Sequence, residues 1–282
     1  MTTELAPVAV QFRLFEARVV RSRRLGPTMV RITFGGEQLT GFASGGRDQS
    51  FSLFLPHPGQ RAPVVPARFG ENWYADWRAI DPRERAVMRS YTIREHRRDA
   101  AEVDVDFALH DDVGPASRWA ARAAEGDRVC LLGPAVADNR SVGFRPPPGT
   151  DWVLLAADET ALPAVGGILD WLPAGTAARV WIEVPHPEDI QDLPAAAGVE
   201  ITWLVRERAA RSGPGLLLEA VRAAELPAGS PYAWIAGESG TVKALRRHLV
   251  GERAFDRRIV NFSGYWRKGA SEEDLRAEAQ SG

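Results

Sequence analysis

Two short segments, RSYTIR at residues 89–94 and DETALP at residues 158–163, decide the fold of this chain of 282 residues. The first ends a β-like run and brings an arginine, a tyrosine and a threonine close together. The second lies where an apolar strand gives way to a helical pattern. The two segments therefore belong to two kinds of structure, an array of short strands and a parallel strand-to-helix turn.

The first half of the chain is predicted to be a β-barrel or sandwich, because short apolar or alternating runs are separated by turn residues. The expected strands cover residues 11–21, 29–34, 50–55, 86–93, 102–109 and 127–132. One helix, expected at residues 116–124, interrupts them after a Gly-Pro pair. Residues 56–82 show no such pattern and are expected to form an irregular loop over the barrel.

The second half of the chain begins after the proline-rich stretch 145–149, which is the best linker candidate. Continuous apolar strands are expected at residues 152–156, 178–184, 199–205 and 232–236, with helices at 160–171, 215–224 and 241–250. Buried strands that alternate with helices predict a parallel sheet covered on both faces. We expect a domain at residues 12–145, a second domain at 150–270, and a polar tail at 271–282 that frays or forms a short polar helix.

Composition excludes several classes of function. The formal net charge is -2, so no overall electrostatic attraction to nucleic acid is expected. The single cysteine, Cys130, excludes an intrachain disulfide and a cysteine-based metal centre, and the five histidines show no metal-ligand spacing, so no protein-bound metal is predicted. No apolar run approaches the ~18 residues of a membrane span and no signal-peptide pattern is found, so a cytoplasmic location is expected.

The residues on the predicted strand 86–93 suit a flavin dinucleotide. Such a cofactor needs a cation and backbone N–H groups for its pyrophosphate, a flat surface for its ring system, and a donor for its N5/O4 edge. Arg89 and Tyr91 project to one side of the strand, whereas Ser90 and Thr92 project to the other. Because the planar guanidinium binds phosphate in a bidentate manner, Arg89 is the candidate phosphate ligand. The alternative is that Arg89 forms a surface ion pair.

Two further positions have the character of anion or nucleotide sites. Gly114-Pro115-Ala116-Ser117 leads into a helix whose first N–H groups lack partners, although an ordinary capped helix explains the same residues. Thr160 lies where an open parallel sheet binds ligands, and either caps its helix or binds a nucleotide phosphate. At the next strand ends, Glu183 would favour NADH, whereas Arg206 and Arg208 would favour NADPH, and the sequence leaves both open.

The chain resembles the siderophore-interacting protein family, the ferric-siderophore reductases within the ferredoxin–NADP reductase superfamily. The stretches that carry the resemblance are residues 89–94, His110 with 114–119, 158–164, 236–238 with 244–249, and 264–269. The resemblance extends from about Phe12 to Gly269. It implies two domains, an N-terminal antiparallel Greek-key β-barrel that binds FAD and a C-terminal α/β parallel-sheet domain that binds the reductant, as in the ferredoxin–NADP reductases.

The resemblance also implies roles for individual residues. Arg89 would reach the FAD phosphates, with Ser90 beside it, and Tyr91 and Thr92 would contact the ribityl–isoalloxazine part. Further implied FAD contacts are His110, Gly114, Ala116 and Ser117. The nicotinamide nucleotide would lie at Asp158, Thr160 and Ala161 and along residues 236–238.

One departure from the family concerns the substrate. The family usually carries a lysine where this chain has Ser52, and that lysine contributes to a basic patch for an anionic ferric siderophore. Its absence leaves Arg47, Arg246 and Arg267 as candidate substrate-binding residues. Trp266, close to the last of these, is a candidate for shielding a face of the flavin.

The predicted function is that of an FAD-dependent ferric-siderophore reductase, with electrons passing from NADH or NADPH through FAD to the ferric siderophore. Reduced ferredoxin or a deazaflavin is an alternative donor. A flavin or other-acceptor reductase of the same superfamily is the second hypothesis, and a non-catalytic siderophore-binding module is the third. Arg89, Tyr91 and Thr92 discriminate between them, because a pure binding module has no need of flavin contacts.

Overall fold

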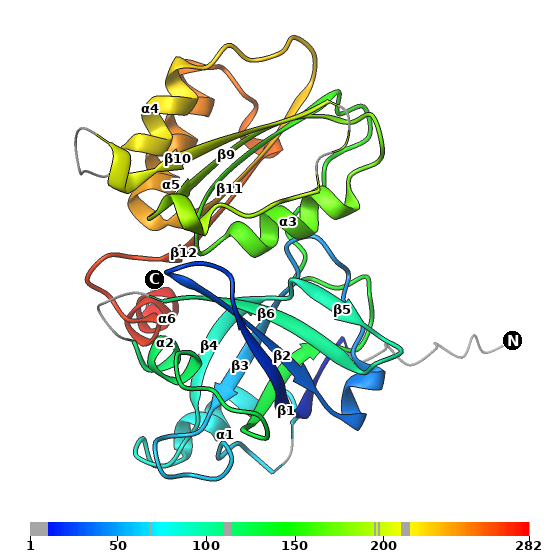
Figure 1. Cartoon of the computed structure of the whole chain (residues 1–282), viewed down its shortest axis with the longest axis vertical. Helices are drawn as coiled ribbons and strands as arrows, with labels where there is room; N and C mark the ends of the chain where they lie inside the picture. Colours follow the sequence, from blue (N-terminus) through cyan, green and yellow to red (C-terminus); the bar gives the residue numbers. More distant parts are fainter. Residues whose placement is uncertain are drawn as a thin grey trace, which may run out of the picture.

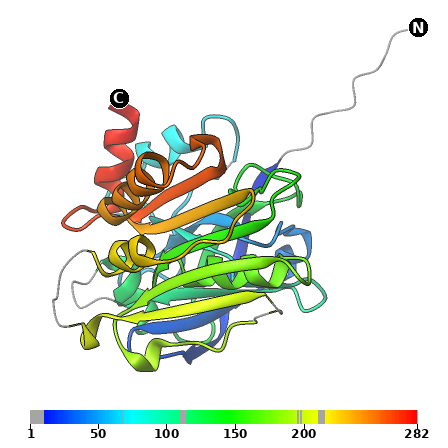
Figure 2. The same ribbon diagram turned by 90° about the horizontal axis from the view of Figure 1, so that it is seen from above.

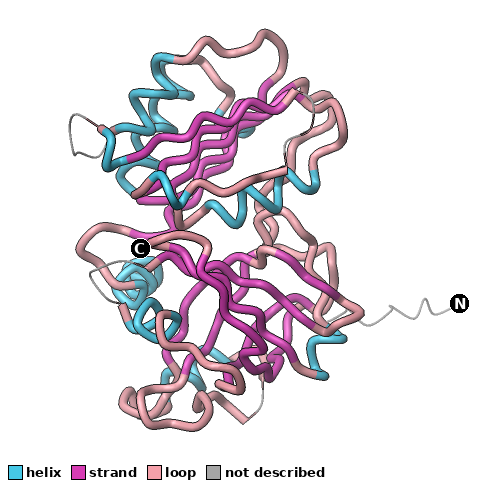
Figure 3. Tube along the Cα trace, viewed as in Figure 1, coloured by secondary structure: helices cyan, strands magenta, loops and turns pink. Residues whose placement is uncertain are grey.

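The computed structural model describes residues 11–67, 69–109, 114–194, 196, 198–209 and 215–281. These residues form two β-sheets, one above the other in Figure 1, and residues 135–151 connect them. Coloured by secondary structure, the two sheets form separate layers, with one helix between them and others at the periphery (Figure 3).

The first sheet has seven antiparallel strands in the order β4-β3-β7-β1-β2-β6-β5. Their bounds are β1 (Phe12–Arg24), β2 (Met29–Gly35), β3 (Ser50–Leu55), β4 (Val87–Thr92), β5 (Glu95–Arg97), β6 (Glu102–Ala108) and β7 (Arg128–Pro134). Fully buried aromatic side chains, among them Phe15, Phe34 and Phe107, fill the inside of the curved sheet. The prediction of an antiparallel barrel is confirmed.

Among the described strands, β4 is an edge strand: it pairs with β3 on one side, and its other edge is not paired with a strand. The sheet curls so that β4 approaches β6, and α2 (Pro115–Ala120) lies against both strands. The backbone N–H of Ser90 therefore points out of the sheet edge, where groups other than a neighbouring strand can bind it.

The second sheet has five parallel strands in the order β10-β9-β8-β11-β12. Their bounds are β8 (Trp152–Asp158), β9 (Ala177–Val184), β10 (Val199–Val205), β11 (Pro231–Glu238) and β12 (Val260–Trp266). Alternate residues of β8 pack against α3 (Leu162–Trp171) on one face and against α4 (Leu216–Ala223) and α5 (Ser239–Arg247) on the other. The predicted parallel α/β domain is confirmed, with α3 on the face turned toward the barrel (Figure 1).

Several predicted elements differ from those observed. The helix expected at residues 116–124 ends at Ala120, because the following residues turn back toward β7 through Gly126, whose φ is 91°. The helix expected from residue 160 begins at Leu162, because residues 158–160 form a hydrogen-bonded turn. The loop expected at residues 56–82 contains α1 (Trp73–Ala79), and β12 was not among the predicted strands.

Two buried carboxylates join the domains. Asp48 accepts hydrogen bonds from the backbone N–H of Gly143 and Phe144 at 3.0 and 2.9 Å and from Nε1 of Trp234 on β11 at 2.9 Å. Asp189 accepts from the backbone N–H and the hydroxyl of Thr28 at 2.9 and 2.8 Å. These contacts fix the barrel against the parallel sheet, although the domain limits 12–145 and 150–270 stay a prediction.

The C-terminal residues form α6 (Glu272–Ser281), which the sequence left as a frayed tail or a short polar helix. The chain returns from β12 toward the barrel, and Figure 2 shows α6 beside α1. None of the helices in the described part of the chain has the length and apolar character needed to span a lipid bilayer.

The single cysteine, Cys130, is buried on β7. Its burial raises the pKa of the thiol to about 11.

Candidate functional site

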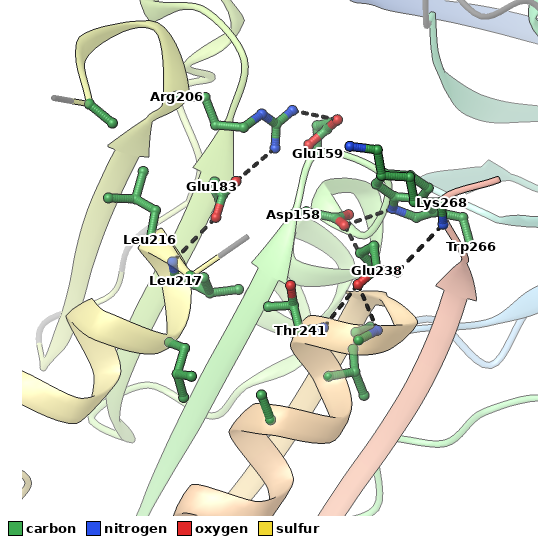
Figure 4. A pocket seen from close by; sticks show the side chains of 17 residues that line it. Asp158, Glu159, Glu183, Arg206, Leu216, Leu217, Glu238, Thr241, Trp266 and Lys268 are labelled. Carbon is green, nitrogen blue, oxygen red and sulfur yellow. Dashed lines mark hydrogen bonds and ion pairs between the residues drawn. The ribbon is translucent and has the colours of Figure 1, made fainter. Parts of the chain in front are cut away.

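A pocket of 790 Å³ opens at the carboxyl edge of the parallel sheet, where such sheets bind ligands (Figure 4). Its polar lining comes from the ends of β8, β9, β11 and β12, from the start of α5 and from the turn after β10. These polar residues are Asp158, Glu159, Glu183, Arg206, Glu238, Thr241, Trp266 and Lys268. The volume lies within the range of small-molecule and cofactor sites.

Asp158 organises the floor of this pocket. Its Oδ2 accepts hydrogen bonds from the backbone N–H of Glu238 at 2.7 Å and from Nε1 of Trp266 at 2.8 Å. Its Oδ1 accepts from the backbone N–H and hydroxyl of Thr160 at 3.0 and 2.5 Å. Burial, reinforced by the neighbouring Glu159, raises the pKa of Asp158. The Thr160 hydroxyl donates to Asp158 and thereby fixes the orientation of this carboxylate. No side-chain cap is found at the start of α3.

Gly237 allows Asp158 to lie where it does. The φ of Gly237 is 140°, a conformation that L-residues rarely adopt. A Cβ added to Gly237 would lie 2.5 Å from Oδ2 of Asp158. The close approach of the two strand ends therefore requires glycine at this position.

Arg206 lies between two carboxylates on the opposite wall of the pocket. Its Nη2 donates to Glu159 at 2.6 Å and its Nη1 donates to Glu183 at 3.0 Å (Figure 4). Glu183 also accepts from the backbone N–H of Leu217 on α4 at 3.3 Å. The pocket thus contains both Glu183 and Arg206, the residues on which the choice between NADH and NADPH was left open, whereas Arg208 does not line it.

The barrel contributes a second group of candidate residues at the edge of β4. Arg89 donates to Glu273 of α6 at 2.5 Å, and its side chain is 14% exposed. The backbone N–H of Ser90 donates to both carboxylate oxygens of Glu272 at 3.1 Å, and the Ser90 hydroxyl donates to the same group at 2.9 Å. Arg89 does form an ion pair, but its partner comes from the C-terminal helix, a contact that sequence reasoning missed.

The other two strand residues lie deeper. The Tyr91 ring packs on Phe107 with centroids 4.4 Å apart, and burial raises the pKa of its phenol. Thr92 is buried and forms a side-chain hydrogen bond with Tyr265 of β12, whose phenol pKa is also raised by burial. Thr92 therefore lies where the barrel meets the parallel-sheet domain.

The turn predicted to bind phosphate is described from Gly114 onward, and its role stays a prediction. Gly114 precedes α2, and a Cβ there would meet nothing within 4 Å. Ala116 is buried in the barrel core, so only its backbone is available to a ligand, and Ser117 lies in the first turn of α2. His110 lies outside the described residues. Because α2 lies against β4, the structure brings this turn and residues 89–92 to one edge of the barrel.

The candidate substrate-binding arginines have separate surroundings. Arg47 donates to the carbonyl oxygens of Gly45 and Phe144. Arg246 lies over the ring of Phe262 on β12, and Arg267 forms an ion pair with Glu278 on α6 at 2.6 Å. Ser52 lies opposite Ser90 on the neighbouring strand, so the lysine usual in the family would project beside the contact with Glu272. No contact among these residues joins the three arginines, and their role stays a prediction.

Comparisons with known proteins identify one family. The family model described as a siderophore-interacting FAD-binding domain matches residues 18–138, and the model described as siderophore-interacting protein matches residues 150–269. The chain is 30% identical over 261 residues to the ferric vibriobactin reductase ViuB of Vibrio cholerae, covering 92% of this chain and 91% of that protein.

Two solved structures resemble the whole molecule. The siderophore-interacting protein SipS from Aeromonas hydrophila has a TM-score of 0.76 at 32% identity and covers 96% of this chain and 97% of its own. A siderophore utilization protein from T. fusca has a TM-score of 0.78 at 35% identity and covers 93% and 95%. The chain therefore belongs to the siderophore-interacting protein family, and its fold is that of the ferredoxin–NADP reductases, since the enzyme from Neisseria gonorrhoeae superimposes with a TM-score of 0.56 at 16% identity.

Proposed function

We propose that this protein is an FAD-dependent reductase of ferric siderophores that takes its electrons from a nicotinamide nucleotide. One observation carries the proposal: a strand whose arginine and edge N–H bind negatively charged groups ends at Thr92, which contacts the domain that holds the nucleotide-sized pocket. A flavin held along β4 would therefore lie next to a site for its reductant. The name of the Vibrio cholerae relative, a ferric vibriobactin reductase, supports the substrate class.

The residues at the edge of β4 fit the phosphates of FAD. Arg89 and the N–H and hydroxyl of Ser90 already bind two carboxylates, so they are aimed at negatively charged oxygens. The half-buried Tyr91 offers an aromatic surface, and Thr92 offers a hydroxyl at the domain junction. We propose Arg89 and Ser90 as phosphate ligands, together with the backbone of Gly114, Ala116 and Ser117.

FAD held by Arg89 and Ser90 would supply hydride acceptance and one-electron transfer to Fe(III), chemistry that amino-acid side chains lack. The protein's part is to hold the cofactor, to place the donor and acceptor beside it, and to keep the ring system out of water. Tyr91, through its packing on Phe107, is rigid enough to orient a flat ligand. Ferrous iron binds hard oxygen ligands more weakly than ferric iron, so reduction releases the metal that the siderophore carries.

The donor we propose is NADH in preference to NADPH. Arg206 is already paired with Glu159 and Glu183, so its charge is largely compensated. Among the described lining residues, four carboxylates face two basic side chains, which disfavours the additional 2′-phosphate of NADPH. Glu183 lies where a carboxylate can accept hydrogen bonds from a ribose diol. Reduced ferredoxin or a deazaflavin is the alternative donor.

The ferric siderophore is proposed to approach the basic side chains Arg47, Arg246 and Arg267, which would dock an anionic chelate. Because reduced nucleotides are cytoplasmic reagents, we also propose a cytoplasmic location.

The test follows the flavin absorption band of FAD-loaded protein without oxygen. NADH is expected to bleach the band at lower concentration than NADPH, and a ferric tris-hydroxamate or tris-catecholate should restore it while a ferrous chelator traps Fe(II). Flavin-free protein is the control. Restoration by free flavin or oxygen but not by either ferric chelate would favour another acceptor. Bleaching by neither nucleotide would redirect the search to ferredoxin, and failure to bind FAD would reject the enzyme.

A further inference from the structure

The first turn of α6 occupies the phosphate ligands that the proposed function assigns to FAD. Glu273 binds the guanidinium of Arg89, and Glu272 binds both the edge N–H and the hydroxyl of Ser90. Glu272 and Glu273, which we call the carboxylate pair, thus bind the same donors that a pyrophosphate would use. The inference drawn from this contact rests on the proposed function.

We propose that α6 is an intramolecular competitor of FAD, with the carboxylate pair bound in place of the cofactor's phosphates. The two ligands exclude each other because Ser90 has one backbone N–H and one hydroxyl proton, and Glu272 accepts both. The negative charges add to the exclusion, since the two carboxylates would strongly repel the two phosphates of FAD in a partly buried site. FAD therefore binds only when the first turn of α6 leaves β4.

Among the described side chains, a second ion pair between α6 and the rest of the chain lies at the surface, which favours this release. Arg267 pairs with Glu278, but the two side chains are 37% and 58% exposed, and exposed pairs contribute little to stability. Asp274 bonds the backbone and hydroxyl of Ser271 within the helix start itself. The chain between β12 and α6 contains Gly269, whose φ of 78° marks a turn with nothing within 4 Å of an added Cβ.

A cavity of 250 Å³ lies beneath the docked helix. Its lining includes Tyr74 and Trp77 of α1, Met88 of β4, and Glu273 and Asp274 of α6. The packing between α6 and the barrel is therefore incomplete next to the carboxylate pair. This arrangement favours a helix that docks through its carboxylates and separates when a stronger anion binds Arg89 and Ser90.

The test measures FAD affinity of the apoprotein by quenching of flavin fluorescence, which needs no turnover. The paired variant Glu272→Gln with Glu273→Gln keeps the size of both side chains and removes their charge. We expect it to bind FAD about 5- to 30-fold more tightly than the wild type, as should a chain ending at residue 271. Glu200→Gln, which removes an exposed carboxylate paired with Arg179 on the other domain, should leave the affinity unchanged.

Arg89→Ala separates this inference from the proposed function. If Arg89→Ala weakens FAD binding while the carboxylate-pair variant and the shortened chain bind like wild type, the FAD site stands and the competition is refuted. Weaker binding by the shortened chain would show that α6 supports the cofactor, which also overturns the proposal. If neither Arg89→Ala nor the loss of the carboxylate pair changes FAD affinity, the FAD site itself is misplaced. In the Arg89→Ala background, Glu273→Gln should give no further gain.

Discussion

Gly237→Ala is expected to destabilise the protein strongly and to open the floor of the pocket at the carboxyl edge of the parallel sheet. The φ of 140° costs an L-residue about 1–3 kcal/mol. The new Cβ would lie 2.5 Å from Oδ2 of Asp158, so this carboxylate must move. Its bonds from Glu238 and Trp266, now 2.7 and 2.8 Å, would then lengthen or break, and hydrogen bonds to charged groups contribute about 1.5–3 kcal/mol each.

If both bonds break, the expected loss of unfolding free energy is about 4–9 kcal/mol, compared with the ~1 kcal/mol of an average substitution. The matched control is Gly59→Ala, because Gly59 also has a positive φ of 88° but nothing lies within 4 Å of an added Cβ. That control should lose only about 1–2 kcal/mol, the conformational cost alone.

Thermal denaturation of both variants measures the difference. For a chain of this size about 2–4 °C is lost per kcal/mol, so Gly237→Ala should melt at least ~8 °C below the wild type and Gly59→Ala about 2–8 °C below it. Gly237→Ala should also bind NADH more weakly in a fluorescence titration. Equal losses of melting temperature in the two variants would refute the argument that the Cβ displaces Asp158.

Three further results are expected. Arg89→Ala should weaken FAD binding by about 1.5–3 kcal/mol, the contribution of a charged hydrogen bond, in a flavin fluorescence titration, with the exposed Arg23→Ala unchanged. Burial, and to a lesser extent two neighbouring arginines, lowers the pKa of His96, so the folded state loses stability as the pH falls below about 6.5. Between pH 7 and 5, the wild type should therefore lose more unfolding free energy, measured in urea, than His96→Leu. Equal losses in the two proteins would contradict this. Glu183→Gln, by releasing Arg206 from one carboxylate, should shift the ratio of NADPH to NADH affinity by about 5- to 10-fold toward NADPH, and an unchanged ratio would remove Glu183 from donor selection.

Local sequence patterns predicted most of the strands. The segments 50–55 and 199–205 coincide with β3 and β10. Each is a short, mainly apolar run, and the residue that follows it does not continue the strand. The pattern failed at β12, VNFSGYW, which mixes small polar residues with an exposed Phe262. It is an edge strand held by one neighbour, so its sequence carries little of the burial that marks the central strands.

The helices show the same limit in another form. The segment WYADWRA lies in a stretch rich in turn residues and was expected to be irregular, yet it forms α1 because Trp77 is buried against Phe54. That burial depends on the barrel beneath it and cannot be read from the segment alone.

Some residues of the candidate site could be predicted from the sequence, whereas others could not. Arg89, Thr92 and Asp158 could be named as candidates because each lies within a short motif whose chemistry is local. The contacts of Glu272 and Glu273 were missed, since the bond from Glu272 to Ser90 spans 182 positions of sequence. Only the path of the chain after β12 brings those carboxylates to β4, and no spacing in the sequence encodes that path.

The burial of Cys130 has a practical consequence for labelling experiments on this protein. A thiol with a pKa of about 11 holds almost no thiolate at neutral pH, and the thiolate is the form that maleimides and spin labels attack. Because the residue is also buried and the chain has no other cysteine, the unmodified protein should behave toward such reagents as though it were cysteine-free. A single cysteine engineered on the surface would then carry the only fluorophore or spin label, so the mobility of that site can be followed without first redesigning the core.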